Sequence, residues 1–290
     1  MRNVVIHYHI FKNAGSSIDR ILASNYGSAW TTFEGKTPTS LLTAFDVEEF
    51  LTSHPDIQAV SSHLARPPLP RVVNAFPIVF LRDPIDRARS VYDYERRSPS
   101  NVRSSEIAKE GDFRNYVRWC LNDGRRQGGV VITNYQVVHL SGSSFRNGHV
   151  YRAEPQESDL EEAMQFLDSI PFFGIVEEFE IALRLIGNAL KPYWPDFRAG
   201  NIRENVSANR VTSFEKRIET IRRELGQDVF QAFQEANHLD LRLYRMALDR
   251  FKQRVSAPPR TRSKFGLKES PLLASFVAAW RKCGFLQLSL

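Results

Sequence analysis

Cysteine is scarce in this sequence, with two residues in 290, Cys120 and Cys283. Two cysteines offer neither a disulfide framework nor a metal-ligand cluster, so we expect a reducing compartment and no structural zinc. Long apolar runs are also missing. The first strand-like run, "NVVIHYHIF" (3–11), is too short and too polar for a signal peptide, and no stretch is long enough to cross a bilayer. These absences predict a cytoplasmic protein.

A Walker A motif is missing as well. That motif needs a Lys-Ser or Lys-Thr pair after its last glycine, where the hydroxyl holds Mg²⁺. In "HYHIFKNAGSSI" (7–18), Lys12 comes before Gly15 instead. A metal-dependent triphosphate enzyme is therefore disfavoured, and we expect no metal ion.

The composition is that of an ordinary globular protein, with 42% hydrophobic and 25% charged residues. The net charge of +6 favours an anionic partner such as a nucleotide, an acidic glycan, a nucleic acid or a membrane surface. The basic residues are scattered among acidic ones without an interleaved aromatic platform, so we expect no nucleic-acid binding.

Strand-like and helix-like segments alternate along the chain. Short apolar runs predict strands at 3–11, 57–64, 76–82 and 172–179. Apolar residues at helical spacing, or helix-start signals, predict helices at 16–26, 83–97, 113–123, 158–170, 180–190 and 213–254. Asp83 suits the N-cap of the second helix and Pro84 its first position. The alternation predicts an α/β protein, a three-layer α/β/α fold with a central, mostly parallel sheet.

The composition changes near the C-terminus. We predict one domain at 1–254, a basic, proline-containing linker at 255–268 and an amphipathic helix at 269–290. The terminal helix is expected to dock on the domain or on a second subunit of a homodimer. The alternative, which the basic linker favours, is a helix that lies on a membrane surface.

Two loops carry chemistry suited to anions. Lys12 ends a strand, Gly15 permits close backbone approach, and a helix start follows, which predicts a phosphate or sulfate site. The alternative is a Gly-Ser turn with a solvated lysine. Arg82 ends another strand and Ser90 follows two turns into its helix, which together suit a second phosphate. A plain salt bridge at a helix start is the alternative there.

Taken together, "HIFKNAGSSI" and "FLRDPIDRARSVYDY" resemble the two nucleotide-binding signatures of sulfotransferases that use 3′-phosphoadenosine-5′-phosphosulfate (PAPS). The resemblance is to the carbohydrate family that includes heparan sulfate 2-O-sulfotransferase and bacterial relatives. It implies a P-loop-like nucleotide-binding fold. The first loop of that family cradles the 5′-phosphosulfate, and the second signature binds the 3′-phosphate.

The resemblance implies donor-binding residues one by one. They are Lys12, Asn13, Ala14, Gly15, Ser16 and Ser17 in the first signature, and Arg82 and Ser90 in the second. Phe11 replaces the usual proline and Asn13 a usual threonine. Weaker similarities at 134–142, 172–183 and 237–244 extend the resemblance to roughly residues 3–250.

The family uses a histidine between the two signatures as general base, and His63 matches it. His9 is the second choice, while an isolated histidine is more often structural. Lys12 would bridge the phosphosulfate and then stabilise the departing phosphate. A comparable family loop closes over the nucleotide, which makes Arg203, Ser207 and Arg210 candidates; an exposed basic loop is the alternative.

The sequence therefore predicts a cytoplasmic, bacterial sulfotransferase that moves a sulfuryl group from PAPS to a hydroxyl of a carbohydrate or glycoconjugate. Tyr92, Tyr94 and Trp119 could stack on sugar rings, although tyrosines on helices usually serve packing. The alternatives are a phosphotransferase and a non-catalytic basic protein that binds anions or polysaccharides.

Overall fold

Five parallel strands form the centre of the protein in a computed structural model that describes residues 1–37, 40–122, 129–146, 154–200 and 213–256. Their order in the sheet is β2-β3-β1-β4-β5, and each neighbouring pair is parallel. The strands are β1 (Asn3–Tyr8), β2 (Trp30–Thr32), β3 (Ala59–Ser62), β4 (Asn74–Leu81) and β5 (Gly174–Ile175). The predicted α/β class and parallel sheet are confirmed.

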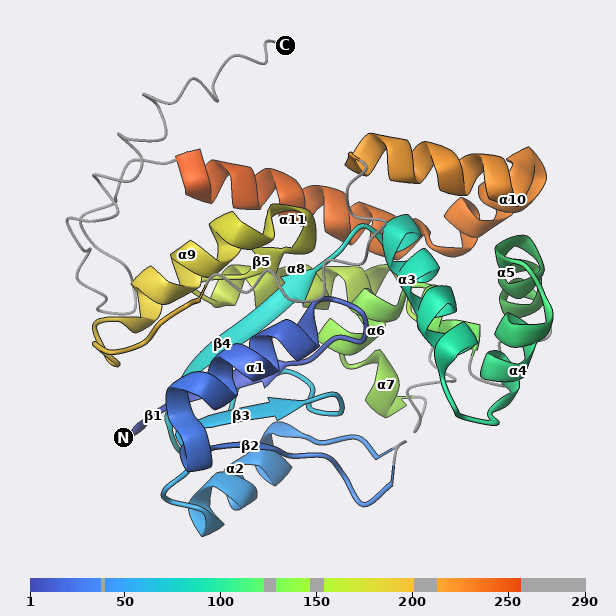
Figure 1. Cartoon of the computed structure of the whole chain (residues 1–290). Helices are drawn as coiled ribbons and strands as arrows, with labels where there is room; N and C mark the ends of the chain where they lie inside the picture. The colour runs from blue at the N-terminus through green and yellow to red at the C-terminus, as the bar shows by residue number, and fades with distance from the viewer. Residues whose placement is uncertain (38–39, 123–128, 147–153, 201–212, 257–290) are drawn as a thin grey trace.

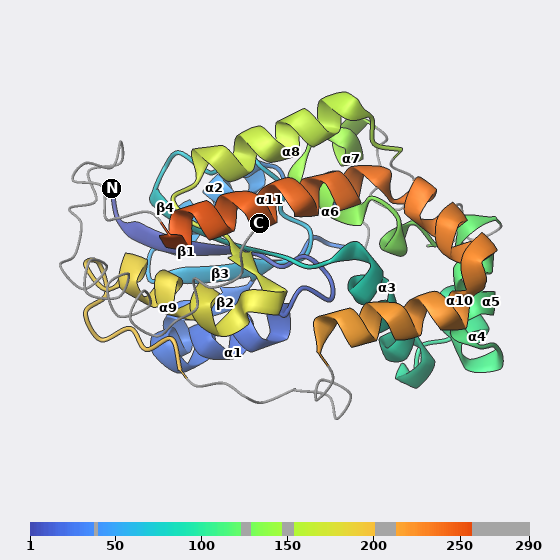
Figure 2. The same cartoon turned by 90° about the horizontal axis from the view of Figure 1, so that it is seen from above.

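Helices cover both faces of this sheet. They are α1 (Gly15–Tyr26), α2 (Ala44–Ser53), α3 (Pro84–Arg97), α4 (Arg103–Glu110), α5 (Phe113–Leu121), α6 (Tyr135–Leu140), α7 (Ser143–Arg146), α8 (Glu157–Ser169), α9 (Phe179–Leu190), α10 (Phe214–Ala236) and α11 (His238–Ser256). Figure 2 shows α8 on one side of the sheet and α1 with α9 on the other. In Figure 1, α3, α4 and α5 lie beyond the carboxyl ends of the strands.

The central strands are apolar on both faces because helices cover both. In β1, Val4, Val5, Ile6 and Tyr8 are all buried, as is usual for strands of a covered parallel sheet. Most of β4 is buried in the same way. These strands and the inward faces of the helices form one hydrophobic core, so the loops at the strand ends start from a rigid base.

Helix α3 begins as the sequence predicts. The Asp83 carboxylate accepts hydrogen bonds from the backbone N–H groups of Ile85 and Asp86, and Pro84 occupies the first turn. A proline there loses nothing, because the first N–H groups of a helix have no partner within the helix.

Three predicted elements differ in extent. The strand predicted at 3–11 ends at Tyr8, and that predicted at 172–179 is only Gly174–Ile175, followed by a 3₁₀ turn at Val176–Glu178. The helical region at 213–254 divides at Asn237 into α10 and α11. Strand β2 and helices α2, α4, α6 and α7 were not predicted. Strand β2 and helices α6 and α7 are too short for an apolar pattern to stand out.

The predicted linker begins inside α11, which runs to Ser256. The rest of the linker and the helix predicted at 269–290 lie outside the described residues. In the part of the chain that is described, no helix has both the length and the apolar character needed to cross a bilayer.

Candidate functional site

The strand order places the candidate site at the carboxyl ends of β1, β3 and β4. The chain passes from β1 to the β2 and β3 side of the sheet and then crosses over β1 to β4. Loops that leave a parallel sheet on either side of such a reversal diverge and leave a crevice where ligands bind. The loops after these three strands carry Lys12, His63 and Arg82, so the topology brings the predicted site residues to one edge.

The loop after β1 has an unusual backbone. Lys12 and Ala14 both have positive φ, 66° and 63°, which residues with a Cβ seldom adopt. Helix α1 starts at Gly15, and its N-cap residue, Ala14, makes no side-chain capping hydrogen bond. The first N–H groups of a helix need partners from outside it, and they carry the positive end of the helix dipole. This helix start therefore suits an anion.

Gly15 is required by a close contact with His9. A Cβ built on Gly15 would lie 1.9 Å from Cδ2 and 2.0 Å from Nε2 of the His9 imidazole. The sequence attributed this glycine to the approach of a ligand. The structure adds a second reason, because the loop lies directly against a histidine ring.

The Lys12 side chain lies against aromatic rings. Its Nζ is 4.7 Å from the ring centroid of Tyr94 and 5.8 Å from that of Phe11, which is within range of a cation–π interaction. Burial lowers the pKa of Lys12, and the charges of Arg82 and Arg97 add to the effect. The charge of Asp93 acts in the opposite direction but more weakly, and no ion pair joins the ammonium group to a carboxylate within the described residues.

Asn13 points into the protein. Its Nδ2 donates to the carbonyl of Phe80, at 2.8 Å, and to Oε1 of Gln136, also at 2.8 Å. Because both partners accept, both amide protons are used within the protein. The Asn13 side chain therefore anchors the loop to β4 and α6. Asn13 would then serve donor binding through the shape that it gives the loop.

Arg82 joins the two signatures. Its Nη1 donates to the backbone carbonyl of Lys12 at 3.0 Å, and its Nε and Nη2 donate to Oδ2 of Asp86 at 3.0 and 2.8 Å. Asp86 is also paired with Arg217 from α10, at 3.0 Å. Two guanidinium groups therefore share the Asp86 carboxylate. Ser90 lies on α3, two turns beyond Arg82, and is partly exposed.

A buried network fixes the backbone of the second signature. Gln136 accepts from the Arg82 N–H at 3.0 Å and donates to the Arg82 carbonyl at 2.9 Å. Asp240, which is fully buried, accepts from the backbone N–H groups of Gln136 and Val137 at 3.0 and 2.8 Å. The similarities at 134–142 and 237–244 thus supply residues that hold the Arg82 loop.

The third weak similarity, at 172–183, also supplies a residue that holds the loop after Arg82. Glu177 accepts from the backbone N–H of Asp83 at 3.1 Å and from the Tyr244 hydroxyl at 3.0 Å. Burial raises the pKa of Glu177 to about 7 and that of Asp83 to about 6. The start of α3 is therefore held by carboxyl groups that titrate near neutral pH.

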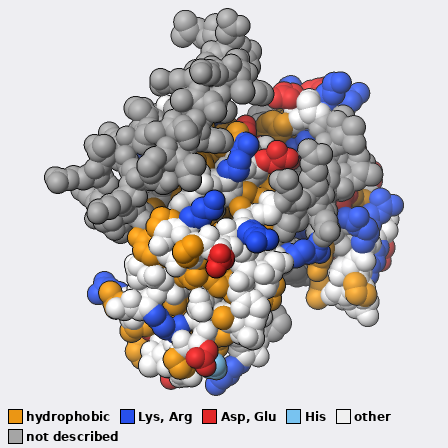
Figure 3. Space-filling model, turned by 60° about the vertical axis from the view of Figure 1, so that its left-hand side comes forward, with side chains coloured by type: hydrophobic (Ala, Val, Ile, Leu, Met, Phe, Trp, Pro, Cys, Tyr) orange, Lys and Arg blue, Asp and Glu red, His pale blue; other side chains and the backbone are white. Residues whose placement is uncertain are grey.

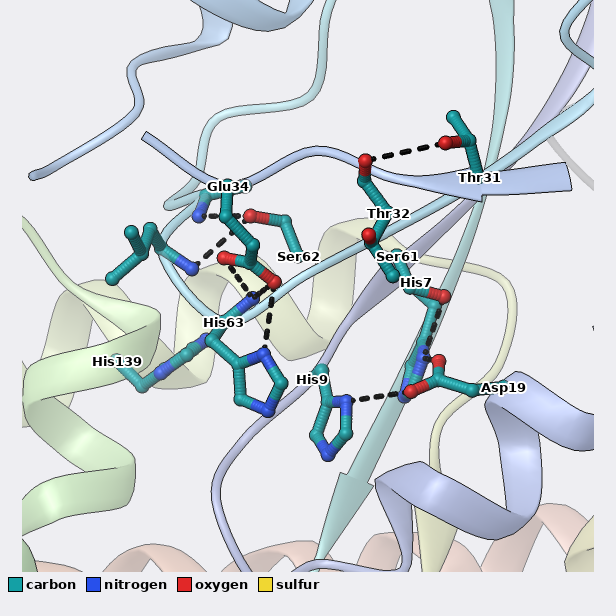
Figure 4. Close-up of polar contacts among 12 residues, drawn as sticks. His7, His9, Asp19, Thr31, Thr32, Glu34, Ser61, Ser62, His63 and His139 are labelled. Carbon is teal, nitrogen blue, oxygen red and sulfur yellow. Dashed lines mark hydrogen bonds and ion pairs between the residues drawn. The ribbon is translucent and has the colours of Figure 1, made fainter. Parts of the chain in front are cut away.

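His63 follows β3 and is held by a carboxylate. Its Nδ1 lies 2.9 Å from Oε1 of Glu34, whose two oxygens also accept from the His63 backbone N–H at 3.0 and 3.1 Å. Its ring stacks on that of His9, with centroids 3.8 Å apart (Figure 4). Since His9 also lies against Gly15, one imidazole separates the first loop from His63.

His7, His9 and Asp19 form the one group that could hold a metal ion within the described residues, with ligand atoms within 4.8 Å of one another. Nδ1 of His7 and Nδ1 of His9 lie 2.8 and 2.9 Å from the two oxygens of Asp19. Burial lowers the pKa of His9 to about 4. Burial also opposes ionisation of Asp19, but its close contacts with both histidines outweigh it and lower the pKa of Asp19. The Asp19 carboxylate thus lies between the two rings, but only the His7 contact has hydrogen-bond geometry, and Nδ1 of His9 has no hydrogen-bond partner among the described residues.

The other expected residues serve packing or lie elsewhere. Tyr92 is buried, and its hydroxyl donates to the carbonyl of Gly111 at 2.9 Å; Trp119 packs against the core. Tyr94 is 45% exposed and adjoins Lys12, so it alone of the three aromatics borders the site. Arg203, Ser207 and Arg210 lie outside the described residues.

Several residues of the site escaped the sequence reading: Asp19, Glu34, Asp86, Gln136, Glu177, Arg217 and Asp240. Asp86, Gln136, Glu177 and Asp240 stand inside segments that the sequence had singled out, whereas Asp19 and Glu34 stand outside them. The carboxylate partners of the histidines come from separate elements, and no spacing in the chain connects them.

The surface gives no sign of a continuous basic patch on the face in Figure 3. Lys and Arg side chains are spread there among apolar, neutral and acidic ones. A cavity of about 280 Å³ is lined by Tyr26 at the end of α1, by Gln58 just before β3 and by residues 193–197 after α9. It is thus at the amino ends of the strands, opposite the candidate site.

No family model matches the chain. The chain is 33% identical over 258 residues to an uncharacterized protein of Archaeoglobus fulgidus. The two belong to one family. The alignment covers 87% of this chain and 98% of the archaeal protein, so the shared region is nearly the whole of that relative.

Proposed function

We propose that this protein is a sulfotransferase that moves a sulfuryl group from PAPS to a hydroxyl of a carbohydrate or glycoconjugate. One observation carries the proposal: the guanidinium of Arg82 donates to the backbone carbonyl of Lys12, 70 residues away in sequence, at 3.0 Å. The two segments that resemble the donor-binding signatures are therefore in contact at one edge of the sheet, as a ligand with two anionic ends requires.

Each part of the site has a role in this reaction. The start of α1, with Gly15, Ser16 and Ser17, would hold the 5′-phosphosulfate through backbone N–H groups and hydroxyls. The guanidinium of Arg82, together with Ser90, would hold the 3′-phosphate. Two separate anion sites discriminate the donor from a nucleoside triphosphate, whose phosphates form a single chain.

Sulfuryl transfer needs a base, a stabilised leaving group and a balanced sulfuryl charge. His63 would take the acceptor proton, and Lys12 would stabilise the bridging oxygen as it departs on 3′,5′-adenosine bisphosphate (PAP). For this the Lys12 ammonium would leave the Tyr94 ring and turn to the donor. Side chains and backbone N–H groups can supply these charges, so the proposal includes no metal ion.

Calorimetry with PAP and with ATP, each with and without Mg²⁺, tests the proposal. We expect PAP to bind without Mg²⁺ and more tightly than ATP, and Ser90→Ala to weaken that binding. We choose Ser90 and not Arg82 for this test, because Arg82 also holds the loop and its substitution would disturb the fold. Tighter binding of ATP in the presence of Mg²⁺ would instead favour a phosphotransferase.

The role of Lys12 has its own test. Lys12→Ala should slow the conversion of PAPS to PAP by about a hundredfold or more, because the leaving group loses its charge stabilisation. Lys191→Ala, at an exposed position after α9, is the matched control. An unchanged rate with only a raised Michaelis constant for PAPS would show that Lys12 merely binds the donor.

The proposal extends to the surroundings of the enzyme on sequence grounds. A cytoplasmic location, a bacterial type of enzyme, a glycan or glycoconjugate acceptor and a C-terminal contact with a membrane or a second subunit all belong to it. Binding to nucleic acid does not, because the basic residues are scattered among acidic ones along the sequence.

A further inference from the structure

The sheet places the side chain of Glu34 beside His63. Glu34 follows β2 and His63 follows β3, and these strands pair in parallel with Thr32 opposite Ser61. The ladder continues beyond β2, because the N–H of Phe33 donates to the carbonyl of Ser61 at 2.9 Å. Two residues that leave neighbouring strands in register stay side by side, although 29 positions separate them.

The contacts of Glu34 determine which nitrogen of His63 carries the proton. An ionised carboxylate can only accept hydrogen bonds, so the Nδ1 atom that lies 2.9 Å from Oε1 must be an N–H. In the neutral ring, Nε2 then carries the lone pair. In Figure 4 the Nε2 atoms of His63 and His9 point to the same side, away from the two carboxylates.

The ring is also held from its face. His9 stacks on it at 29° between the ring planes, and is itself buried and paired with Asp19. Because burial keeps the pKa of His9 near 4, His9 is neutral at neutral pH and does not repel a charged neighbour. His63 nevertheless stays reachable, with 45% of its side chain exposed.

We propose that Glu34 is the positioning residue of His63, holding it in the Nδ1–H tautomer with the Nε2 lone pair free to accept a proton. This deepens the proposed sulfotransferase function and rests on it for its catalytic part. In the reaction, the acceptor O–H bond breaks and its proton goes to Nε2, while an O–S bond forms to the sulfuryl group. The bond from sulfur to the bridging oxygen breaks, and its electron pair leaves on the 5′-phosphate of PAP.

Glu34→Gln isolates this role. The glutamine keeps the shape and can still accept from the backbone N–H of His63, but its amide can also donate to Nδ1. Both tautomers of His63 then become available. Both side chains are partly exposed, so we expect no loss of folding. Glu49→Gln, at an exposed position on α2, is the matched control.

Two measurements decide the matter. Proton–nitrogen NMR of the imidazoles at about pH 8, where histidines are ordinarily neutral, should show His63 as the Nδ1–H tautomer in the natural protein and as a mixture in Glu34→Gln. The conversion of PAPS to PAP with water as acceptor should slow by about tenfold or more in the variant, within the range that a general base contributes. Binding of PAP and the melting temperature should not change.

The outcomes separate the two proposals. An unchanged tautomer signal and an unchanged rate in Glu34→Gln would overturn the role of Glu34 while leaving the sulfotransferase intact. A natural protein that neither binds PAP nor converts PAPS would overturn the sulfotransferase and the catalytic role of Glu34. The NMR signal would still decide whether Glu34 sets the tautomer. Partial recovery of the rate in Glu34→Asp supports the proposal.

Discussion

Gly15 and His9 are in contact so close that a methyl group cannot fit between them. His9 cannot move aside easily, because His7, His63 and Asp19 surround its ring. At the scale of single residues, this contact links the loop after β1 to the histidines, so a substitution at Gly15 should displace both.

Gly15→Ala should destabilise the protein by about 1–3 kcal/mol, the usual cost of overpacking a core, and weaken PAP binding because the loop must shift. Urea denaturation and calorimetry measure the two effects. Gly187→Ala in α9 is the control, since its new methyl group would meet only Ala199 Cβ at 3.2 Å. Equal effects of the two substitutions would contradict the close packing of His9 on the loop.

Ala14→Gly should have the opposite sign. Ala14 has a φ of 63°, which costs a residue with a Cβ about 1 kcal/mol or more and costs glycine little. We therefore expect a gain in the free energy of unfolding of about 1 kcal/mol with PAP binding retained. Ala23→Gly, within the same helix, should lose about 0.5–1 kcal/mol. A loss of stability in both variants would show that the left-handed backbone at Ala14 is not strained.

The sequence could single out residues that stand in a contiguous motif, but not residues whose partners lie far away in the chain. Lys12, Gly15 and Arg82 could be found because the strand, turn and helix start around them are local. Glu34 could not be found, because its partner is 29 residues away and β2, which aligns the two, is a three-residue strand. Asn13 could be located but not interpreted, since its partners lie on β4 and α6.

At the scale of elements, Glu177 connects three parts of the fold that are adjacent in space but distant in the sequence. It lies in the 3₁₀ turn after β5, accepts from the start of α3, and accepts from Tyr244 on α11. Its pKa is raised to about 7 from 4.5. Between these values the folded state holds a proton that the unfolded state has released, so stability falls as the pH rises through this range.

Glu177→Gln should remove the part of this pH dependence that comes from Glu177, while the smaller part from Asp83, whose pKa is raised to about 6, stays. The natural protein should lose up to about 3 kcal/mol between pH 4.5 and 7 through this group, whereas the amide stays neutral and still accepts from Asp83. Urea denaturation at both ends of the range measures the difference, with Glu161→Gln on the exposed face of α8 as control. A natural protein that is equally stable at both pH values would contradict the raised pKa of Glu177.

The elements themselves were predicted according to their length. Long segments with a clear period, such as α1, α8 and α9, were found within a few residues of their bounds. The segment at 172–179 looked like a full strand because it is apolar, yet it pairs with β4 over only two residues. The chain turns there so that Glu177 reaches α3, a tertiary contact that local sequence does not encode.

At the scale of the whole molecule, all five strands belong to one sheet and the buried residues form one core. We therefore expect one cooperative unfolding transition, and a ligand held at the edge of the sheet should stabilise all of it. PAP at about 100 times its dissociation constant adds about 2.7 kcal/mol. For a protein of this size that should raise the melting temperature by about 5 °C.

Differential scanning calorimetry measures this shift, with adenosine at the same concentration as control because it lacks both phosphates. Two separate transitions, of which only one responds to PAP, would show that the site belongs to a part of the chain that folds on its own.

Strand β1 divides the candidate site into two halves. On one side, Asn13, Gln136 and Asp240 anchor the loops that carry Lys12 and Arg82 to β4, α6 and α11. On the other side, Glu34 and His63 directly follow β2 and β3. Substitutions in the β2 and α2 region can therefore accumulate without touching the anchors of the Lys12 and Arg82 loops. If the proposed function holds, proteins descended from one ancestor could in this way keep the same donor while their acceptors diverge, because each half of the site would be under its own selection.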